Sequence, residues 1–201
     1  MVPLRCIELS GVQRHHLLNL ARGSINSGLV SGQPLPINVD SLEEGLRAKV
    51  GVFVTLTING KLRGCIGNLQ SNKALGVSVA DNAFGAAFRD PRFGELESRE
   101  FPVTRIEISV LSPMARVEAE SRTALLQAIH PGADGLLLED GKHRSTFLPQ
   151  VWEQLTEPEH FVDQLLLKAG LPADHWSPTL SFKRYHSLSF AEPKPSSTQA
   201  E

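Results

Sequence analysis

Cysteine is scarce in this sequence. Two of its 201 residues are cysteines, Cys6 and Cys65, and their spacing fits neither a CxxC redox motif nor a compact metal site. The first residues contain no apolar run behind a charged region, so we expect no secretory signal. We therefore expect a cytoplasmic protein with reduced thiols, no disulfide between the two cysteines, and no metal or other cofactor.

Long apolar runs and an excess of one charge are also lacking. The longest apolar runs fall well short of the ~20 residues that a membrane-spanning helix needs. Acidic and basic side chains number 22 and 20, which gives a formal net charge of −2. Non-specific binding to nucleic acid requires a basic surface, so a nucleic-acid partner is not expected, and neither is a membrane.

Helices are predicted where apolar residues recur at a spacing of three or four. The first covers Gln13 to Asn26. A second is predicted from a cap at Ser71 or Asn72 to about Arg89, where Asp90-Pro91 ends it; its many alanines and glycines favour close packing against a sheet. Further helices are expected around residues 121–129 and in "QVWEQL" and "EHFVDQLLLKAGL".

The segment "VGVFVTLTINGKLRGCIG" predicts a β-hairpin, because β-branched residues precede the turn signal Asn59-Gly60. A two-residue loop would place Arg63 and Cys65 on the same face as the aliphatic residues at 52, 54 and 56. A three-residue loop from Ile58 to Gly60 avoids this, and we predict it together with its register.

That register pairs Leu56 with Leu62 and Val52 with Ile66. In this register the face of the hairpin opposite the aliphatic residues carries three side chains of the second strand, Lys61, Arg63 and Cys65. Arg63 and Cys65 would then be neighbours on one strand face, roughly 7 Å apart.

Later segments predict more strands. "VTRIEISVLSP" alternates as a half-buried strand, "GLLLEDGKHRSTFLP" predicts a second hairpin around Asp140-Gly141, and "PTLSFKRYHSLSF" predicts one final strand. Hairpins interspersed with helices indicate the α+β class, with antiparallel sheets covered by helices. The tail "AEPKPSSTQAE", residues 191–201, is predicted to be disordered.

Cys65 is the main candidate for chemistry. A cysteine in a strand is often a small buried packing residue, but Arg63 on the same face would favour the thiolate. The flanking Gly64 and Gly67 either open the backbone to an anionic ligand or mark a bulge or tight packing.

The "RDPRF" segment is the second candidate. Arg89, Asp90 and Arg92 either form an ion pair that ends a helix or act together on a ligand. In the second interpretation Asp90 is a base or an orienting carboxylate, and the two arginines clamp an anion. Seven scattered histidines show no metal-binding spacing, so no metal site is assigned.

The order of "LRGCIGNL", "ADNAFGAAFRDPRF", "IEISVLSP", "RSTFLPQVWEQ" and "KAGL…W" resembles the AMMECR domain family over roughly Leu17 to Phe190. The resemblance implies one AMMECR domain over residues 1–190, built from two packed subdomains, each a two-layer arrangement of antiparallel sheet and helices. The family's motif maps onto residues 63–67 and 90–93 and onto Pro149. This chain has "GKHRSTFLP" where many relatives have glycine-rich residues, and Arg144 in it is a further predicted ligand-binding residue.

Prokaryotic members of that family resemble the A component of the AmmeMemoRadiSam set, so the resemblance implies Memo-like and radical-SAM partners. Two hypotheses remain open. In the first, the protein is an enzyme or an enzyme component in which Cys65 acts as a nucleophile or redox thiol, with Arg63 and Asp90 as catalytic residues. In the second, it is a non-catalytic binding or adaptor protein that uses the same patch to recognise a small anionic ligand, RNA or a protein.

Overall fold

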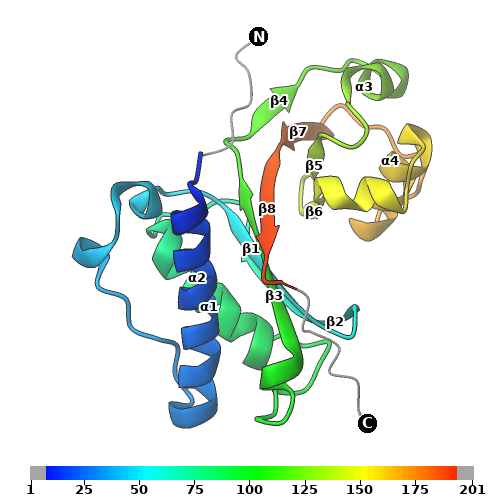
Figure 1. Ribbon diagram of the computed structural model, residues 1–201. Coiled ribbons are helices and arrows are strands. Elements are labelled where there is room, and N and C mark those ends of the chain that lie inside the picture. Colours follow the sequence, from blue (N-terminus) through cyan, green and yellow to red (C-terminus); the bar gives the residue numbers. More distant parts are fainter. Residues whose placement is uncertain (1–7, 194–201) are drawn as a thin grey trace. The chain divides into compact units, whose positions relative to one another are not determined.

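The computed structural model describes residues 8–193, and the chain separates into two compact units (Figure 1). The first unit contains residues 8–111 and 188–193, and the second contains residues 112–187. Each unit contains a four-stranded antiparallel sheet with helices, which confirms the predicted α+β class.

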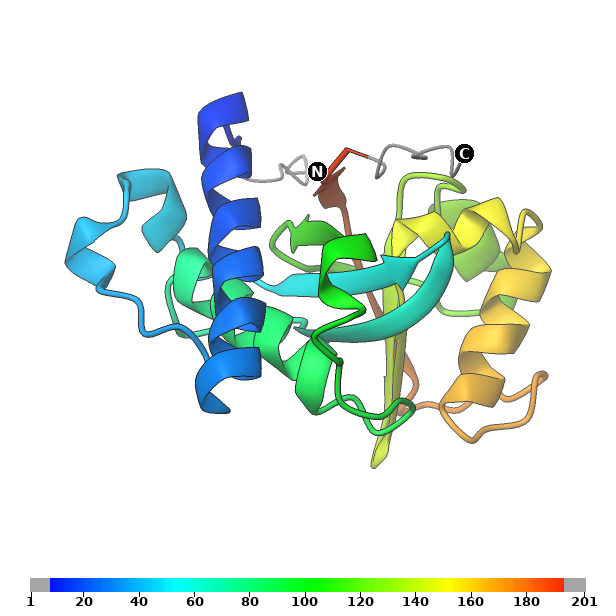
Figure 2. The same cartoon turned by 60° about the horizontal axis from the view of Figure 1, so that its bottom comes forward.

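The first unit packs two helices against its sheet. The helices are α1 (Gly11–Ser31) and α2 (Leu75–Phe88), and they lie against each other in both views (Figure 1, Figure 2). The sheet has the order β2-β1-β3-β8. Its strands are β1 (Val52–Ile58), β2 (Lys61–Asn68), β3 (Thr104–Leu111) and β8 (Ser187–Ala191), with short 3-10 turns at Val39–Ser41, Glu44–Arg47 and Phe101–Val103.

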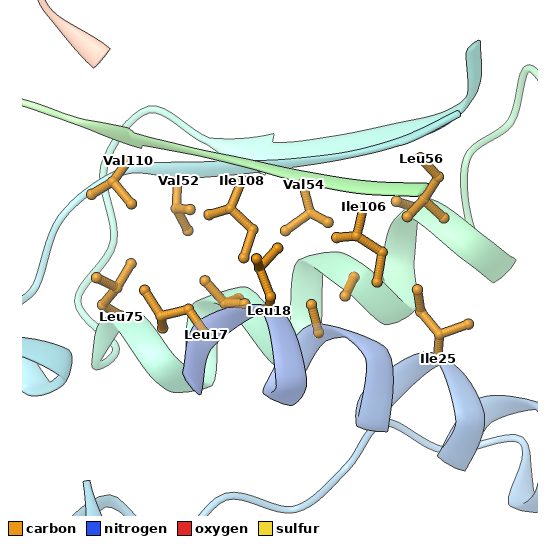
Figure 3. Close-up of a cluster of buried hydrophobic side chains, with 14 of the residues drawn as sticks. Leu17, Leu18, Ile25, Val52, Val54, Leu56, Leu75, Ile106, Ile108 and Val110 are labelled. Carbon is orange, nitrogen blue, oxygen red and sulfur yellow. The ribbon is translucent and has the colours of Figure 1, made fainter. Parts of the chain in front are cut away.

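Alternating aliphatic side chains form the core of this unit. Every second residue of β1 and β3 points at α1 and α2, as Figure 3 shows for Val52, Val54, Leu56, Ile106, Ile108 and Val110. All six are fully buried. The intervening residues lie on the other face of the sheet and are mostly polar, Phe53 being the exception, so the predicted strand alternation is confirmed for both segments.

The predicted register of the β1–β2 hairpin is wrong. The loop has two residues, Asn59 and Gly60, both with positive φ (51° and 76°), as this tight hairpin turn requires. Leu56 pairs with Gly64, and Thr57 pairs with Leu62. The residue between them, Arg63, is therefore an extra residue in a β-bulge, which restores the alternation that a two-residue loop would have broken.

The predicted start of the second helix is also wrong. Neither Ser71 nor Asn72 caps it; α2 begins at Leu75, after Ala74, without a side-chain cap. The Ser71 hydroxyl accepts a hydrogen bond from the Lys73 backbone N–H and contacts the Ser78 hydroxyl at 2.9 Å. These local bonds hold a turn in place of a first helical turn. The predicted end near Arg89 is confirmed.

The second unit has the sheet order β4-β7-β5-β6. The elements of this unit are β4 (Ala115–Val117), α3 (Arg122–Ala128), β5 (Gly135–Asp140), β6 (His143–Phe147), a 3-10 turn at Pro149–Glu153, α4 (Pro158–Lys168) and β7 (Ser181–Tyr185). The hairpin of β5 and β6 is confirmed. The hydrophobic core of the second unit contains Trp152 and Phe161, whose rings stack with centroids 3.8 Å apart.

The prediction of one final strand is wrong, because the segment forms two strands in different sheets. β7 belongs to the second unit, and β8 completes the sheet of the first. The break falls at His186, whose backbone N–H donates to the Ser112 hydroxyl and whose carbonyl accepts from the Ser112 N–H. β8 continues to Ala191, and the Glu192 carboxylate pairs with Arg22. Residues 194–201 lie outside the described residues.

Close packing between α2 and β2 depends on Gly64. A Cβ atom at Gly64 would lie 2.0 Å from the Ala86 backbone oxygen, a contact that only backbone movement can relieve. Gly64→Ala should therefore lower the free energy of unfolding by about 3 kcal/mol, measured by urea denaturation. Gly94→Ala is the matched control, because a Cβ there meets nothing within 4 Å. Equal stability of the two variants would contradict this account of the packing.

Candidate functional site

The backbone of Cys65 is held by the turn that follows α2. The Cys65 N–H donates to Asp90 Oδ2 at 2.8 Å, and Arg92 Nη2 donates to the Cys65 carbonyl at 3.3 Å. β2 is an edge strand, and the N–H and C=O of one strand residue point to the same side. The Asp90–Arg92 pair therefore occupies the open edge of the sheet at Cys65, and we call this arrangement the edge clamp.

Asp90 is the central group of the edge clamp. Its side chain is 2% exposed. Besides the Cys65 N–H, its carboxylate accepts bonds from the Arg92 backbone N–H, Nε and Nη2 at 3.1, 2.9 and 2.7 Å. The hydrogen bonds from the Arg92 side chain, followed by the backbone N–H bonds, hold the pKa of Asp90 well below its usual range despite burial. Asp90 therefore stays ionised, and the geometry favours an orienting role over that of a base.

Arg63 is directed into the loop before β3. Its Nε and Nη2 bond to the two carboxylate oxygens of Glu100 at 2.8 and 2.9 Å, and Nη1 and Nη2 donate to the carbonyls of Gly94 and Glu95, both at 3.0 Å. This bidentate pair raises the pKa of Arg63 and lowers that of Glu100 to about 2. Among the described residues, no hydrogen bond joins the Arg63 side chain to Cys65.

The thiol of Cys65 lies on the sheet face opposite the aliphatic core. Cys65 pairs with Thr55 of β1, and the Thr55 hydroxyl donates to Cys65 Sγ at 3.3 Å. Both side chains are half-buried. Within residues 8–193, no histidine or carboxylate forms a hydrogen bond with this sulfur. Its neighbours are the Thr55 hydroxyl and the guanidinium of Arg92, whose pKa is raised mainly by Asp90 and in smaller part by Cys65.

The two glycines around Cys65 are explained by packing. A Cβ on Gly64 would collide with the backbone of α2, and a Cβ on Gly67 would lie 2.3 Å from the Phe53 ring. Neither has a positive φ. Since α2 begins only at Leu75, whose N–H donates to the Ala48 carbonyl, the free N–H groups of a helix start do not follow directly on Gly67.

Among the described residues, the two remaining predicted arginines form no hydrogen bond with Cys65. Arg89 is exposed beyond the end of α2, with its guanidinium carbon 4.7 Å from the centre of the Phe84 ring. Arg144 belongs to β6 of the second unit, where it pairs with Glu139 at 3.2 Å. The structure thus brings together Cys65, Asp90 and Arg92, with Arg63 beside them on β2, and does not bring Arg89 into the edge clamp.

Sequence reasoning missed Thr55 and Glu100. Thr55 had a weak signal, as a polar residue alternating with buried aliphatics on the strand before the hairpin. Glu100 had none, because its partner Arg63 is 37 residues away in a connection without periodicity. Over the described range, no three His, Cys, Asp or Glu residues are grouped to hold a metal ion. No helix in that range has the length and apolarity to span a membrane.

A model of the AMMECR1 protein family matches residues 18–190, which include the edge clamp. The chain belongs to the AMMECR1 family. A protein of Methanothermobacter thermautotrophicus is 36% identical over 191 residues, covering 94% of this chain and 99% of that protein. A protein of Methanococcoides burtonii is 37% identical over 175 residues, covering 84% and 83% of the two chains.

A solved structure similar to this AMMECR1-family chain is that of the uncharacterised protein PH0010 from Pyrococcus horikoshii. The two have a TM-score of 0.82 and 32% sequence identity, over 89% of this chain and 91% of the other. The predicted family and fold class are therefore both confirmed. The names of these relatives assign no activity.

The Arg63–Glu100 pair predicts an acid-sensitive contribution to stability. Glu100 has a lowered pKa, so the stabilisation is present above the ordinary glutamate pKa and is lost as the pH falls toward about 2. The difference in urea midpoint between wild type and Glu100→Gln should thus be large at pH 6 and shrink at pH 3. Glu44→Gln, at an exposed glutamate, is the control and should show no such convergence. A constant difference for Glu100→Gln would contradict the assignment.

Proposed function

We propose that this AMMECR1-family protein is an enzyme, or a component of an enzyme, in which the Cys65 thiol is the reacting group, as a nucleophile or redox thiol. The observation that carries the proposal is the difference between the backbone and the side chain of Cys65. The N–H and C=O of Cys65 are both held by charged partners, whereas its partly buried side chain has two donors beside it, the Thr55 hydroxyl and the Arg92 guanidinium.

A fixed backbone has a direct use in thiol chemistry. A reacting atom must be held in a defined position relative to its substrate, and small displacements cost much of the rate. The Thr55 hydroxyl adds to this, since a hydrogen bond to an anion is stronger than one to a neutral acceptor, so it favours the thiolate. Asp90 and Arg92 are positioning residues in this scheme. Memo-like and radical-SAM proteins, which the resemblance implies, are the proposed partners.

The competing function is that of a binding or adaptor protein in which Cys65 only packs. The edge clamp has a use there too, because it blocks edge-to-edge pairing of β2 with another chain. This alternative gains little from the predicted anion clamp, since Arg63 and Arg92 are each paired with a carboxylate. Arg89 remains as an exposed cation, stacked on Phe84. We therefore place the thiol function first.

The reactivity of Cys65 distinguishes the two functions. In a Cys6→Ser background Cys65 is the only thiol, and its alkylation by iodoacetamide at pH 7 can be followed by mass spectrometry. We expect the folded protein to react at least about tenfold faster than the same chain in urea, because a held thiolate reacts and a thiol does not. Adding Cys65→Ser should abolish labelling. Folded protein that reacts more slowly than unfolded chain would favour the binding function.

Asp90→Asn tests the positioning role in the same assay. It removes the charge from the edge clamp but keeps the shape of the side chain. We expect a several-fold slower alkylation of Cys65 in protein that is still folded by circular dichroism. If the rate is unchanged, the edge clamp serves the sheet edge and not the thiol.

A further inference from the structure

A row of three side chains crosses the sheet at Cys65. Thr55 of β1 pairs with Cys65 of β2 on one side and with Glu107 of β3 on the other. Directly paired residues point to the same face of a sheet, so the thiol, the hydroxyl and the carboxylate lie on one face in that order. All three side chains are half-buried.

Glu107 differs from the other carboxylates near this face. Asp90, Glu100 and Glu192 each hold an arginine, at 2.7, 2.8 and 2.6 Å. Within residues 8–193, by contrast, the Glu107 carboxylate has no hydrogen bond or ion pair. Removing a charge partly from water without a partner is unfavourable. The fold therefore carries a desolvation cost at Glu107 that the arginine pairs offset at Asp90, Glu100 and Glu192.

Among the described residues, no arginine of this region forms an ion pair with Glu107. Arg63 and Arg92 are neutralised by Glu100 and Asp90. Arg105 shares the face of β3 with Glu107, but its Nε donates to the Glu192 backbone carbonyl at 2.7 Å, beside β8 and on the far side of β3 from Cys65. Among the described residues, no cation therefore bonds to the Glu107 carboxylate on the side that faces Thr55 and Cys65.

The spacing of the row limits what can bind. Neighbouring strands are about 4.8 Å apart, so the Cα atoms of Cys65 and Glu107 are separated by roughly 10 Å. A ligand that reaches both groups must extend over about this distance past Thr55. An ammonium or guanidinium group is the chemical complement of a partly buried carboxylate.

We propose that the Cys65 site takes a cationic ligand, with an ammonium or guanidinium group paired to Glu107 and its electrophilic atom facing the thiol. This inference rests on the proposed function, because it assumes that the thiol reacts. The charge of this ligand is opposite to that of the anionic ligand, which was one alternative of the binding hypothesis drawn from the sequence. Glu107 is then a binding residue for the ligand, and Thr55 lies between Glu107 and Cys65, beneath the middle of the ligand.

Charged thiol reagents test the proposal directly. Methanethiosulfonates form a mixed disulfide with a thiol and release methanesulfinate, and they exist with cationic trimethylammonium-ethyl, anionic sulfonatoethyl and neutral methyl groups. The rates at Cys65 in the Cys6→Ser background are divided by those for 2-mercaptoethanol, which removes intrinsic reactivity. We expect a cationic-to-anionic ratio at least about fivefold above unity, falling in high salt because the attraction is electrostatic.

Variants assign the effect to Glu107. Glu107→Gln should bring the ratio to within about twofold of unity, and Glu107→Asp, which keeps the charge, should retain most of the preference. Glu44→Gln is the matched control: it removes one exposed carboxylate from a turn that packs on α2, on the helix side of the sheet, and should change nothing. Should Glu107→Gln fail to fold, the salt dependence and the Glu107→Asp ratio still decide the question.

The outcomes separate the two proposals. A ratio near unity or below it in the wild type, or a preference that survives Glu107→Gln, overturns the cationic ligand, while rapid labelling by the neutral reagent still supports the thiol function. If all three reagents label folded protein more slowly than unfolded chain, both proposals fail together.

Discussion

The close approach of the Gly64 backbone to the Ala86 carbonyl is the constraint on which the rest of the site depends. It lets the last turns of α2 lie directly on β2, at a distance that no side chain could occupy. The helix then ends two residues later, at Phe88, and the next residues turn back toward the strand that the helix covers. The Asp90 carboxylate can reach the Cys65 N–H for that reason, so a packing requirement of the core fixes the geometry of the thiol.

The second level of organisation is electrostatic. Pairs of opposite charge occupy the borders of the first sheet: Asp90 with Arg92 at the free edge of β2, Arg63 with Glu100 before β3, and Arg22 with Glu192 after β8. Each pair also bonds to backbone groups, so each ties a connection to a strand. Within the described part of the chain, Glu107 differs from these residues because it belongs to no such pair and bonds to no connection. The proposed ligand preference follows from that contrast.

Much of the fold could be predicted from the sequence because the deciding signals are local. Alternation predicted β1 and β3, the turn residues predicted both hairpins but not the register of the first, and the Asp90-Pro91 stop predicted the end of α2. The errors occurred where distant parts decide the structure. The bulged residue Arg63 bonds to Glu100, 37 residues away, and the first residue of α2, Leu75, donates its N–H to the distant Ala48 carbonyl. The break at His186 depends on Ser112, 74 residues earlier.

The candidate site could likewise be predicted from the sequence only in part. The residues of the edge clamp were predicted as candidates, yet their division of labour was not, because a carboxylate that orients a backbone and one that accepts a proton look alike in a sequence. Thr55 and Glu107 became meaningful only once the register was known, since their relation to Cys65 runs across strands and not along the chain.

The order of the strands along the chain has a consequence for biosynthesis. The whole second unit, residues 112–187, is encoded between β3 and β8, which are adjacent in the first sheet. A ribosome therefore delivers the last strand of the first unit only after every residue of the second unit has been made. The first unit must wait with the β3 edge of its sheet unpaired, and unpaired edges invite association. Early folding of the second unit would shorten that interval, because it brings the residue before β8 back to Ser112 while β8 itself is still emerging.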